Sequence, residues 1–397
     1  MRVFENISRG RAISLFLLVY LIVALYPSLR NLSLPLKGDL VQGFAYTEYN
    51  NFIIFKQSFW HLMRGLDLYA AYPAEHYDLY KYTPVFALLF APFALVPTGL
   101  GLLAWNILNV LLPLWALSRI FPAKGRVLMA LSLLVIPEVL TSAFNSQSNG
   151  LVVGLLVVAL GDIQREKWTS AAVFITLSAL IKLFGVLFFA LFLLRPDAWK
   201  NWLWRAMLVV VLLVGMPLLL GLSGHYASYL DLLQRDHSSE LKHSIFGWIQ
   251  AWFGGFETPT HRTWGLFAGL IIQAIPLLFK RVQARIVPYA ASWLMFMVLF
   301  NHMAESASFV IAVMGVVLYL VDIAREKAWH WSGLISAFIV LLVLGTLLGP
   351  TDLYPSVLRE FIVFKAQLKT FPVVLFWLAA WWDSIKKGPQ SEAFSQA

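Results

Sequence analysis

Cysteine and charge are the features that this sequence has least of. None of its 397 residues is cysteine, which excludes disulfides and thiolate metal sites. Only 13% of the residues are charged, against about 25% in an ordinary soluble domain, whereas 60% are hydrophobic. A soluble protein cannot bury that much apolar surface in a core, so the composition excludes the soluble globular class and indicates a membrane protein.

Long apolar runs support this interpretation. A transmembrane helix needs about 20 mostly apolar residues, and runs that meet or approach this length lie at 12–28, 99–118, 206–222, 305–321 and 332–349. The first run follows a basic start and is not followed by a small-residue cleavage site, so we expect a retained helix and not a signal peptide.

The expected architecture is an all-α polytopic membrane protein with about 12 transmembrane helices. Residues 1–387 are expected to form one transmembrane domain, and 388–397, rich in Ser and Gln, a disordered cytoplasmic tail. The segment 84–97 is too short for a full crossing, so we predict a short or re-entrant helix there. Short helices at membrane depth are tolerated where they line a cavity, and this stretch is therefore expected to surround a site.

The basic residues indicate topology. The net charge of +9 is scattered in short clusters and forms no continuous stripe, so nucleic acid is not an expected partner. The positive-inside rule places these clusters and both termini in the cytoplasm. The protein is then expected in the inner (plasma) membrane, with 29–83 as a first exterior loop and 223–262 as a second, aromatic one.

The first exterior loop is the least membrane-like part of the chain. Between Glu48 and Arg64 its sequence predicts an amphipathic helix lying in the membrane interface. One face is apolar: Phe52, Phe55, Phe59 and Leu62. The other faces are polar: Lys56, Gln57, His61 and Arg64. A tyrosine-rich segment able to stack on sugar rings follows at 66–83.

Four carboxylates in this loop are candidates for a catalytic base: Asp39, Glu48, Asp67 and Asp78. Exterior carboxylates are more often solvated or cap turns, and Asp67 and Asp78 stand in turn-like sequence. Glu48 fits that interpretation least, because it opens the predicted helix, where a carboxylate faces both bilayer and water.

Other polar residues stand next to apolar segments. FNSQSNG places Gln147 and Asn149 at an exterior helix junction, and LIKLFG places Lys182 in an apolar stretch. An intramembrane lysine costs about 2.5–3.5 kcal/mol by insertion scales, so a partner or a function is expected, such as binding a phosphate; the alternative is a lysine that reaches the headgroups. In FNHMAESASF, His302 and Glu305 are predicted to share one helix face. Two interpretations are open: they contact a substrate phosphate or hydroxyl, or they form only a hydrogen bond with each other. A metal site is disfavoured because no third ligand is nearby.

The order of these motifs resembles a known family. An acidic residue opening an amphipathic segment, then GLDLY, YKYTPVFALLFAPFALVP, SQSNG and IKLFGVLFFALFLLR, is similar to the polyprenol-phosphate-mannose-dependent glycosyltransferases of family 87, which have the GT-C fold. The resemblance implies that Glu48 is the base, with Asp39 in reserve, although strict register instead puts Asn51 at that position. It also implies substrate contacts at Lys81, Tyr82, Gln147, Asn149 and Lys182, and more loosely at His302 and Glu305.

The expected reaction is transfer of a hexose, mannose by the resemblance, from a polyprenyl-phosphate donor to a glycolipid or polysaccharide outside the cytoplasm. A carboxylate takes the acceptor proton, and a cation stabilises the leaving phosphate. A single displacement inverts the anomeric centre and needs neither cofactor nor metal. A lipid-sugar transporter or flippase is the alternative, but no inverted repeat is visible. A non-catalytic scaffold has no reason to keep Lys182 in an apolar segment.

Overall fold

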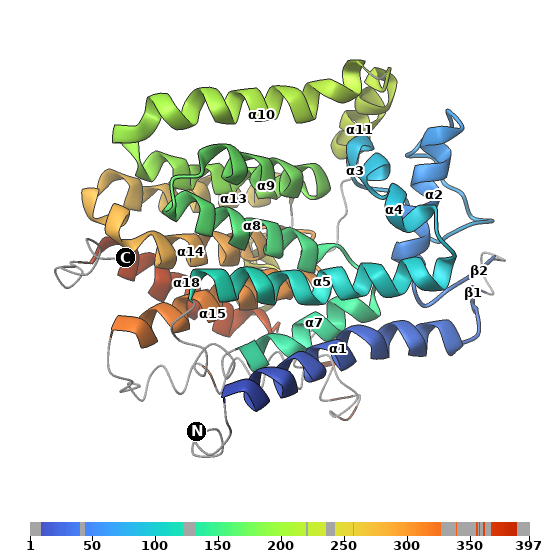
Figure 1. Ribbon diagram of the computed structural model, residues 1–397, viewed down its shortest axis with the longest axis horizontal. Coiled ribbons are helices and arrows are strands. Elements are labelled where there is room, and N and C mark those ends of the chain that lie inside the picture. Colours follow the sequence, from blue (N-terminus) through green and yellow to red (C-terminus); the bar gives the residue numbers. More distant parts are fainter. Residues whose placement is uncertain are drawn as a thin grey trace. The chain divides into compact units, whose positions relative to one another are not determined.

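A computed structural model of the chain describes residues 9–39, 44–121, 132–219, 221–235, 243–256, 258–326, 339, 355, 357, 360–361 and 367–386. Over these residues the chain is mainly helical, with one short hairpin near the N-terminus (Figure 1). The predicted tail at 388–397 and the predicted crossing at 332–349 lie outside the described residues.

The chain folds into two compact units, each discontinuous in sequence. The first unit comprises Met1–Val186, Leu203–Ser238 and Ser306–Val310, and the second comprises Leu187–Trp202, Ser239–Glu305 and Ile311–Ala397. The prediction that residues 1–387 form one transmembrane domain stays a prediction.

The first unit holds the N-terminal helices and the hairpin. Its elements are α1 (Arg9–Ser33), β1 (Lys37–Asp39), β2 (Phe44–Tyr46), α2 (Asn50–Met63), α3 (Pro84–Leu89), α4 (Ala91–Ala94), α5 (Thr98–Ile120), η3 (Leu133–Val135), α7 (Ile136–Phe144), α8 (Asn149–Gln164), α9 (Trp168–Ile181), α11 (Ser223–Arg235) and η8 (Ser306–Ser308). Helix α5 packs against both α1 and α8, and α8 packs against α9 (Figure 1). The strands pair antiparallel, with Lys37 opposite Tyr46.

Small residues let α5 and α8 approach closely. A Cβ on Gly150 would lie 2.0 Å from the backbone oxygen of Asn109, and one on Gly154 would lie 2.7 Å from the Leu112 side chain. The Asn109 carboxamide oxygen accepts a hydrogen bond from Leu151 N at 2.8 Å and so satisfies a donor in the first turn of α8. Close contact through small residues is the usual way membrane helices pack, because lipid gives little hydrophobic drive to associate.

Helix α2 confirms the predicted amphipathic helix, and its place in the membrane interface stays a prediction. Its apolar face is buried against aromatic rings: Phe55 alone makes edge-to-face contacts with Phe86, Phe90 and Trp105. One correction concerns His61, predicted on a polar face: it is buried, because the tyrosine-rich segment folds back over it.

The short segment 84–97 is interrupted, as predicted. Helix α3 ends at Leu89 and α4 covers only Ala91–Ala94. Pro84 begins α3, where its missing N–H costs nothing, and Pro92 at the start of α4 cannot continue the preceding hydrogen-bond ladder. The loop 66–83, which precedes these helices, lies beside α2, where Asn50 bonds to Tyr77 and His61 contacts Glu75.

The second unit is built of helices as well. Its elements are η5 (Pro196–Ala198), α12 (Ile245–Phe253), α13 (Pro259–Ala274), η6 (Ile275–Leu278), η7 (Lys280–Arg285), α14 (Ile286–Leu299) and α18 (Thr370–Ile385), while η4 (Leu183–Leu194), α10 (Trp199–Leu219) and α15 (Phe309–Glu326) have residues in both units. Helix α14 packs along α18, and every residue of α14 is buried.

Several helices are long and apolar enough to cross a membrane. Within the described residues five qualify: Phe16–Ser33, Thr98–Ile120, Pro196–Gly215, Lys280–Leu299 and Ser306–Ala324. Shorter apolar helices also occur, α8 and α9 among them. The chain is thus a multi-pass membrane protein, and a total of about 12 crossings remains a prediction.

Candidate active site

Glu48 lies in the turn between the hairpin and α2. The structure begins α2 at Asn50, so Glu48 precedes the helix and does not open it as predicted. Its Oε2 lies 2.9 Å from Nζ of Lys37 on β1, and 22% of its side chain is exposed. This contact orients the carboxylate, which is still within reach of solvent.

The first turn of α2 ties Glu48 to two other segments. Asn51 Nδ2 donates to the Asn145 backbone oxygen at 2.9 Å, at the end of α7. Asn50 forms two hydrogen bonds with the backbone of Tyr77, donating to its oxygen at 2.6 Å and accepting from its nitrogen at 2.9 Å. The predicted base is therefore fixed beside both the α7–α8 junction and the tyrosine-rich loop.

The α7–α8 junction brings Gln147 to the same loop. Tyr82 Oη donates to Gln147 Oε1 at 3.1 Å, so these two predicted site residues lie together. Asn149 has a different position: its Nδ2 donates to the Ala307 backbone oxygen at 2.9 Å, and the residue is buried. Its contact with substrate stays a prediction, and its carboxamide also links α8 to η8.

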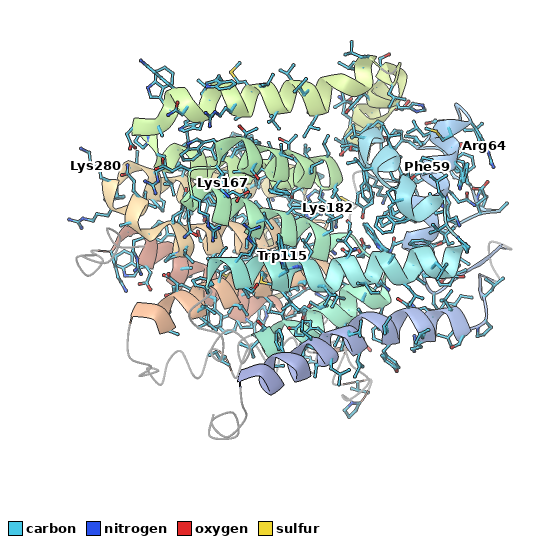
Figure 2. All side chains as sticks on the ribbon, in the orientation of Figure 1. Phe59, Arg64, Trp115, Lys167, Lys182 and Lys280 are labelled. Atoms are coloured by element: carbon cyan, nitrogen blue, oxygen red, sulfur yellow. The ribbon has the colours of Figure 1, made fainter. Side chains whose placement is uncertain are left out.

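Lys182 stands where α9 ends, and Figure 2 labels it. It has an extended backbone conformation, so the chain turns there from α9 into the 3-10 helix η4. Both helices are apolar, so Lys182 lies in an apolar stretch, as predicted. Two residues earlier, the Leu180 backbone oxygen accepts a hydrogen bond from the Thr83 hydroxyl. Thr83 follows Tyr82 directly, so the loop joins the Gln147 junction to the end of α9.

The remaining loop carboxylates behave as turn residues. Asp67 Oδ1 accepts from Tyr69 N at 3.0 Å, and Asp78, whose φ is +73°, accepts from Leu79 N at 2.7 Å. Asp78 also lies 3.6 Å from Nζ of Lys81. Asp39 has its backbone in β1 opposite Phe44, and its side chain is outside the described part of the structure. Its reserve role as base stays a prediction.

His302 and Glu305 belong to the second unit. Helix α14 ends at Leu299 and the next helical turn begins at Ser306, so both residues stand in an irregular connection. The prediction that they share one helix face is wrong, because the apolar pattern stops before Asn301. Their role in substrate binding stays a prediction. In the described ranges, no three His, Asp or Glu side chains are grouped as metal ligands.

Two features of the first unit were not predicted from the sequence. His61 Nε2 lies 2.9 Å from Glu75 Oε2 and its ring stacks on Tyr72 with centroids 3.8 Å apart, which fastens the loop onto α2. Glu138 is fully buried in the apolar helix α7. A carboxylate in such a helix is itself a functional signal, whereas no local pattern reveals the partner of His61.

A run of buried hydroxyls follows Glu138. In the described part of the chain, the hydroxyls of Ser142, Ser146 and Ser148 have no hydrogen-bond partner. Ser146 also has a left-handed backbone, with φ of +50°. Buried polar groups left unsatisfied by protein mark places where water or a polar ligand completes the bonding, and this run flanks Gln147.

Burial shifts the titration of several loop residues. Burial lowers the pKa of His76, opposed by its hydrogen bond to the Asp78 backbone oxygen. Burial also raises the pKa of Tyr229, on α11, to about 12, and its ring lies 5.7 Å from that of Tyr69. Tyr229 is therefore neutral at physiological pH.

Comparison with known proteins identifies the class and then the family. The model of glycosyltransferase family 87 matches residues 80–314, more than half of the chain. The protein is thus a membrane glycosyltransferase, and it belongs to glycosyltransferase family 87, as the motif order suggested. The family confirms the expected enzyme class and helical GT-C-type architecture, and it decides against a transporter or scaffold.

Two solved structures are also similar. The first is ArnT from Cupriavidus metallidurans bound to undecaprenyl phosphate, with 17% identity and a TM-score of 0.49. The match covers 95% of this chain and 78% of that one. The second is the same protein in the apo state, with 16% identity, a TM-score of 0.48 and coverage of 94% of this chain and 77% of that one. The comparison with curated proteins gives no match.

Proposed function

We propose that the protein transfers a hexose, mannose in the first instance, from a polyprenyl-phosphate donor to a hydroxyl of a glycolipid or polysaccharide, with inversion at the anomeric carbon. The observation that carries this proposal is Glu48, ion-paired with Lys37 and fixed through Asn51 to the junction that holds Gln147. A charged, partly exposed carboxylate next to a polar junction is what a hydroxyl acceptor requires.

The proposed chemistry is a single displacement. Glu48 accepts the proton of the acceptor hydroxyl while that oxygen bonds to the anomeric carbon. The bond between this carbon and the phosphate oxygen breaks at the same time, and its electron pair leaves with the polyprenyl phosphate. Lys37 holds the Glu48 carboxylate in position before the reaction.

The leaving phosphate gains negative charge, so its stabilisation calls for a cation. Lys182, at the end of α9, is assigned this role, and Gln147 and Tyr82 are assigned to hydroxyls of the donor sugar. The buried hydroxyls around Gln147 support a polar occupant there. Electrostatic stabilisation by a pre-positioned charge is often the largest catalytic contribution. His302 and Glu305 remain proposed substrate contacts.

The reaction is proposed to occur on the extracytoplasmic face of the inner membrane. The donor is a membrane lipid, and apolar helices such as α10, with Val211 and Leu212 well exposed, offer it a lipid-facing surface. The native chain has no cysteine, so single cysteines report cleanly on sidedness. A membrane-impermeant thiol reagent should label Met63→Cys from outside intact cells and Lys167→Cys only after lysis; labelling of Met63→Cys only from the cytoplasmic side would contradict the proposal.

The direct test uses purified protein in lipid nanodiscs. The protein is given one of three donors: polyprenyl-phosphate mannose, polyprenyl-phosphate glucose or a nucleotide sugar. An extract of cell-envelope glycans serves as acceptor, and release of polyprenyl phosphate is measured. Transfer from mannosyl lipid with inverted configuration, unchanged by EDTA, is expected. Transfer only from the nucleotide sugar would overturn the donor assignment, and retained configuration would overturn the single displacement.

A further inference from the structure

The tyrosines of the first exterior loop are not equivalent. Tyr69 and Tyr80 are buried, so their rings are closed to any ligand. Tyr72 packs on His61, and Tyr82 bonds to Gln147. Tyr77 differs from these residues, because 42% of it is exposed. The sequence suggested that the whole run stacks on sugars, whereas the structure points to this one ring.

Tyr77 forms one half of an aromatic pair. Its ring stacks on that of Tyr46, with centroids 5.2 Å apart and planes 23° apart. Offset stacking of this kind is a favoured aromatic geometry. Tyr46 covers one face of the Tyr77 ring, so a ligand reaches the ring through the exposed part of the residue.

The pair is held rigidly beside Glu48. Asn50 bonds to both the nitrogen and the oxygen of the Tyr77 backbone, at 2.9 and 2.6 Å. Tyr46 lies opposite Lys37 in the hairpin, and Lys37 in turn contacts Glu48 at 2.9 Å. The stacked pair and the proposed base therefore share the same two supports, the hairpin and the first turn of α2.

We propose that Tyr77, stacked on Tyr46, is the platform for the acceptor, and that the acceptor is a carbohydrate whose pyranose ring lies against the tyrosine. A pyranose presents a face of C–H bonds, which suits the electron-rich face of an aromatic ring. The inference rests on the proposed function, because it is the acceptor, and not the donor phosphate, that must place its hydroxyl on Glu48.

Chemistry separates this subsite from that of the donor. The donor's phosphate is assigned to Lys182. The loop reaches this region through Thr83, whose hydroxyl donates to the backbone oxygen of Leu180, two residues before Lys182. Tyr77 stands earlier in the same segment, against the first turn of α2. A substitution at Tyr77 should then change acceptor binding and leave donor binding alone.

The experiment measures three quantities with purified protein in nanodiscs: the acceptor KM, the donor KM and the slow hydrolysis of the donor by water. Tyr77→Leu keeps apolar bulk without a ring, and Tyr77→Phe keeps the ring. We expect Tyr77→Leu to raise the acceptor KM about tenfold with donor KM and hydrolysis unchanged, and Tyr77→Phe to stay within about twofold. Tyr26→Leu, at a tyrosine of α1 that is also exposed, serves as the matched control.

The outcomes distinguish this inference from the proposed function. An unchanged acceptor KM in Tyr77→Leu, or equal rises in donor and acceptor KM, would overturn the platform while wild-type transfer still supports the function. Wild-type preference for a long-chain alcohol over a methyl pyranoside would overturn the carbohydrate assignment. No turnover of any polyprenyl-phosphate sugar by the wild type would overturn the proposed function itself.

Discussion

Two buried polar clusters, one in each unit, differ in how far their hydrogen bonds are satisfied. In the second unit, Gln273 is fully buried and its polar groups are satisfied: Nε2 donates to Ser292 Oγ at 2.7 Å, Oε1 accepts from Trp377 Nε1 at 2.9 Å, and the backbone oxygen accepts from Tyr289 Oη at 2.9 Å. In the first unit, several hydroxyls between 142 and 148 have no partner within the described residues.

This contrast separates polar groups that hold the fold from those available for chemistry. A closed network such as that of Gln273 links α13, α14 and α18, and its bonds are worth more in a low-dielectric interior. An open cluster costs free energy unless water or a ligand completes it. The open cluster lies beside Gln147 and the ion-paired Glu48 is tied to the same junction, so the chemistry is expected in the first unit.

The largest effect should come from the proposed base. Glu48→Gln keeps the shape and removes the charge, so we expect kcat to fall by about 10²- to 10⁴-fold with little change in thermal stability. The loop carboxylate Asp67, which caps a turn, gives the matched control Asp67→Asn. Comparable activity in the two variants would move the base to Asp39.

Lys182 tests the charge requirement at the other end of the loop. Replacing it with Met should lower kcat by about 10²- to 10³-fold, because the leaving phosphate loses its cation, and Lys182→Arg should retain more activity. Lys167 flanks the opposite end of the same helix, α9, so Lys167→Met is the control. Steady-state assays of the three variants measure these effects. Equal activity of Lys182→Met and Lys167→Met would show that Lys182 only reaches the lipid headgroups and does not act on the phosphate.

The closed and open polar clusters can be compared through stability. Gln273→Leu should lower the free energy of unfolding by about 1–3 kcal/mol, since Trp377 and Ser292 lose partners while buried. Ser142→Ala should change it by less than about 0.5 kcal/mol, because its hydroxyl has no partner in the described structure. Thermal unfolding in detergent measures both changes. Equal losses of stability in the two variants would contradict the distinction between the two clusters.

The smallest expected effect is a pH dependence of the loop. Burial lowers the pKa of His76 below its ordinary value of 6.5, so the unfolded loop binds a proton more readily than the folded one. The stability that His76 contributes is therefore complete above pH 6.5 and is lost as the pH falls towards the folded pKa. The titratable groups that face it are His61, Glu75 and Asp78.

His76→Asn isolates this contribution, because the amide retains a donor for the Asp78 backbone oxygen but does not titrate. Hydrogen exchange of peptides covering 72–82, corrected for the intrinsic effect of pH, should show protection that falls between pH 7.5 and 5.5 more steeply in the wild type than in the variant. If protection fell equally with pH in the wild type and the variant, His76 would not be the source of the pH dependence.

Local patterns were sufficient for the parts of the fold where burial follows helical spacing. The apolar face of α2 and the break in segment 84–97 both follow from spacing and proline positions, and the structure has them. Spacing failed for His61 and for the pair His302 and Glu305. His61 is buried by a distant segment, and the second pair lies beyond the end of a helix whose apolar run continued to Phe300.

The sequence by itself determined that this chain enters a membrane, which family of glycosyltransferases it belongs to, and which residue types are available for its chemistry, because composition and motif order are properties of the chain alone. Tertiary structure decided which of those residues meet. Glu48 faces Lys37 across a hairpin, Tyr82 reaches Gln147, and one tyrosine of the loop stays exposed while its neighbours are buried. Such pairings depend on contacts between residues far apart in sequence, which no local periodicity encodes.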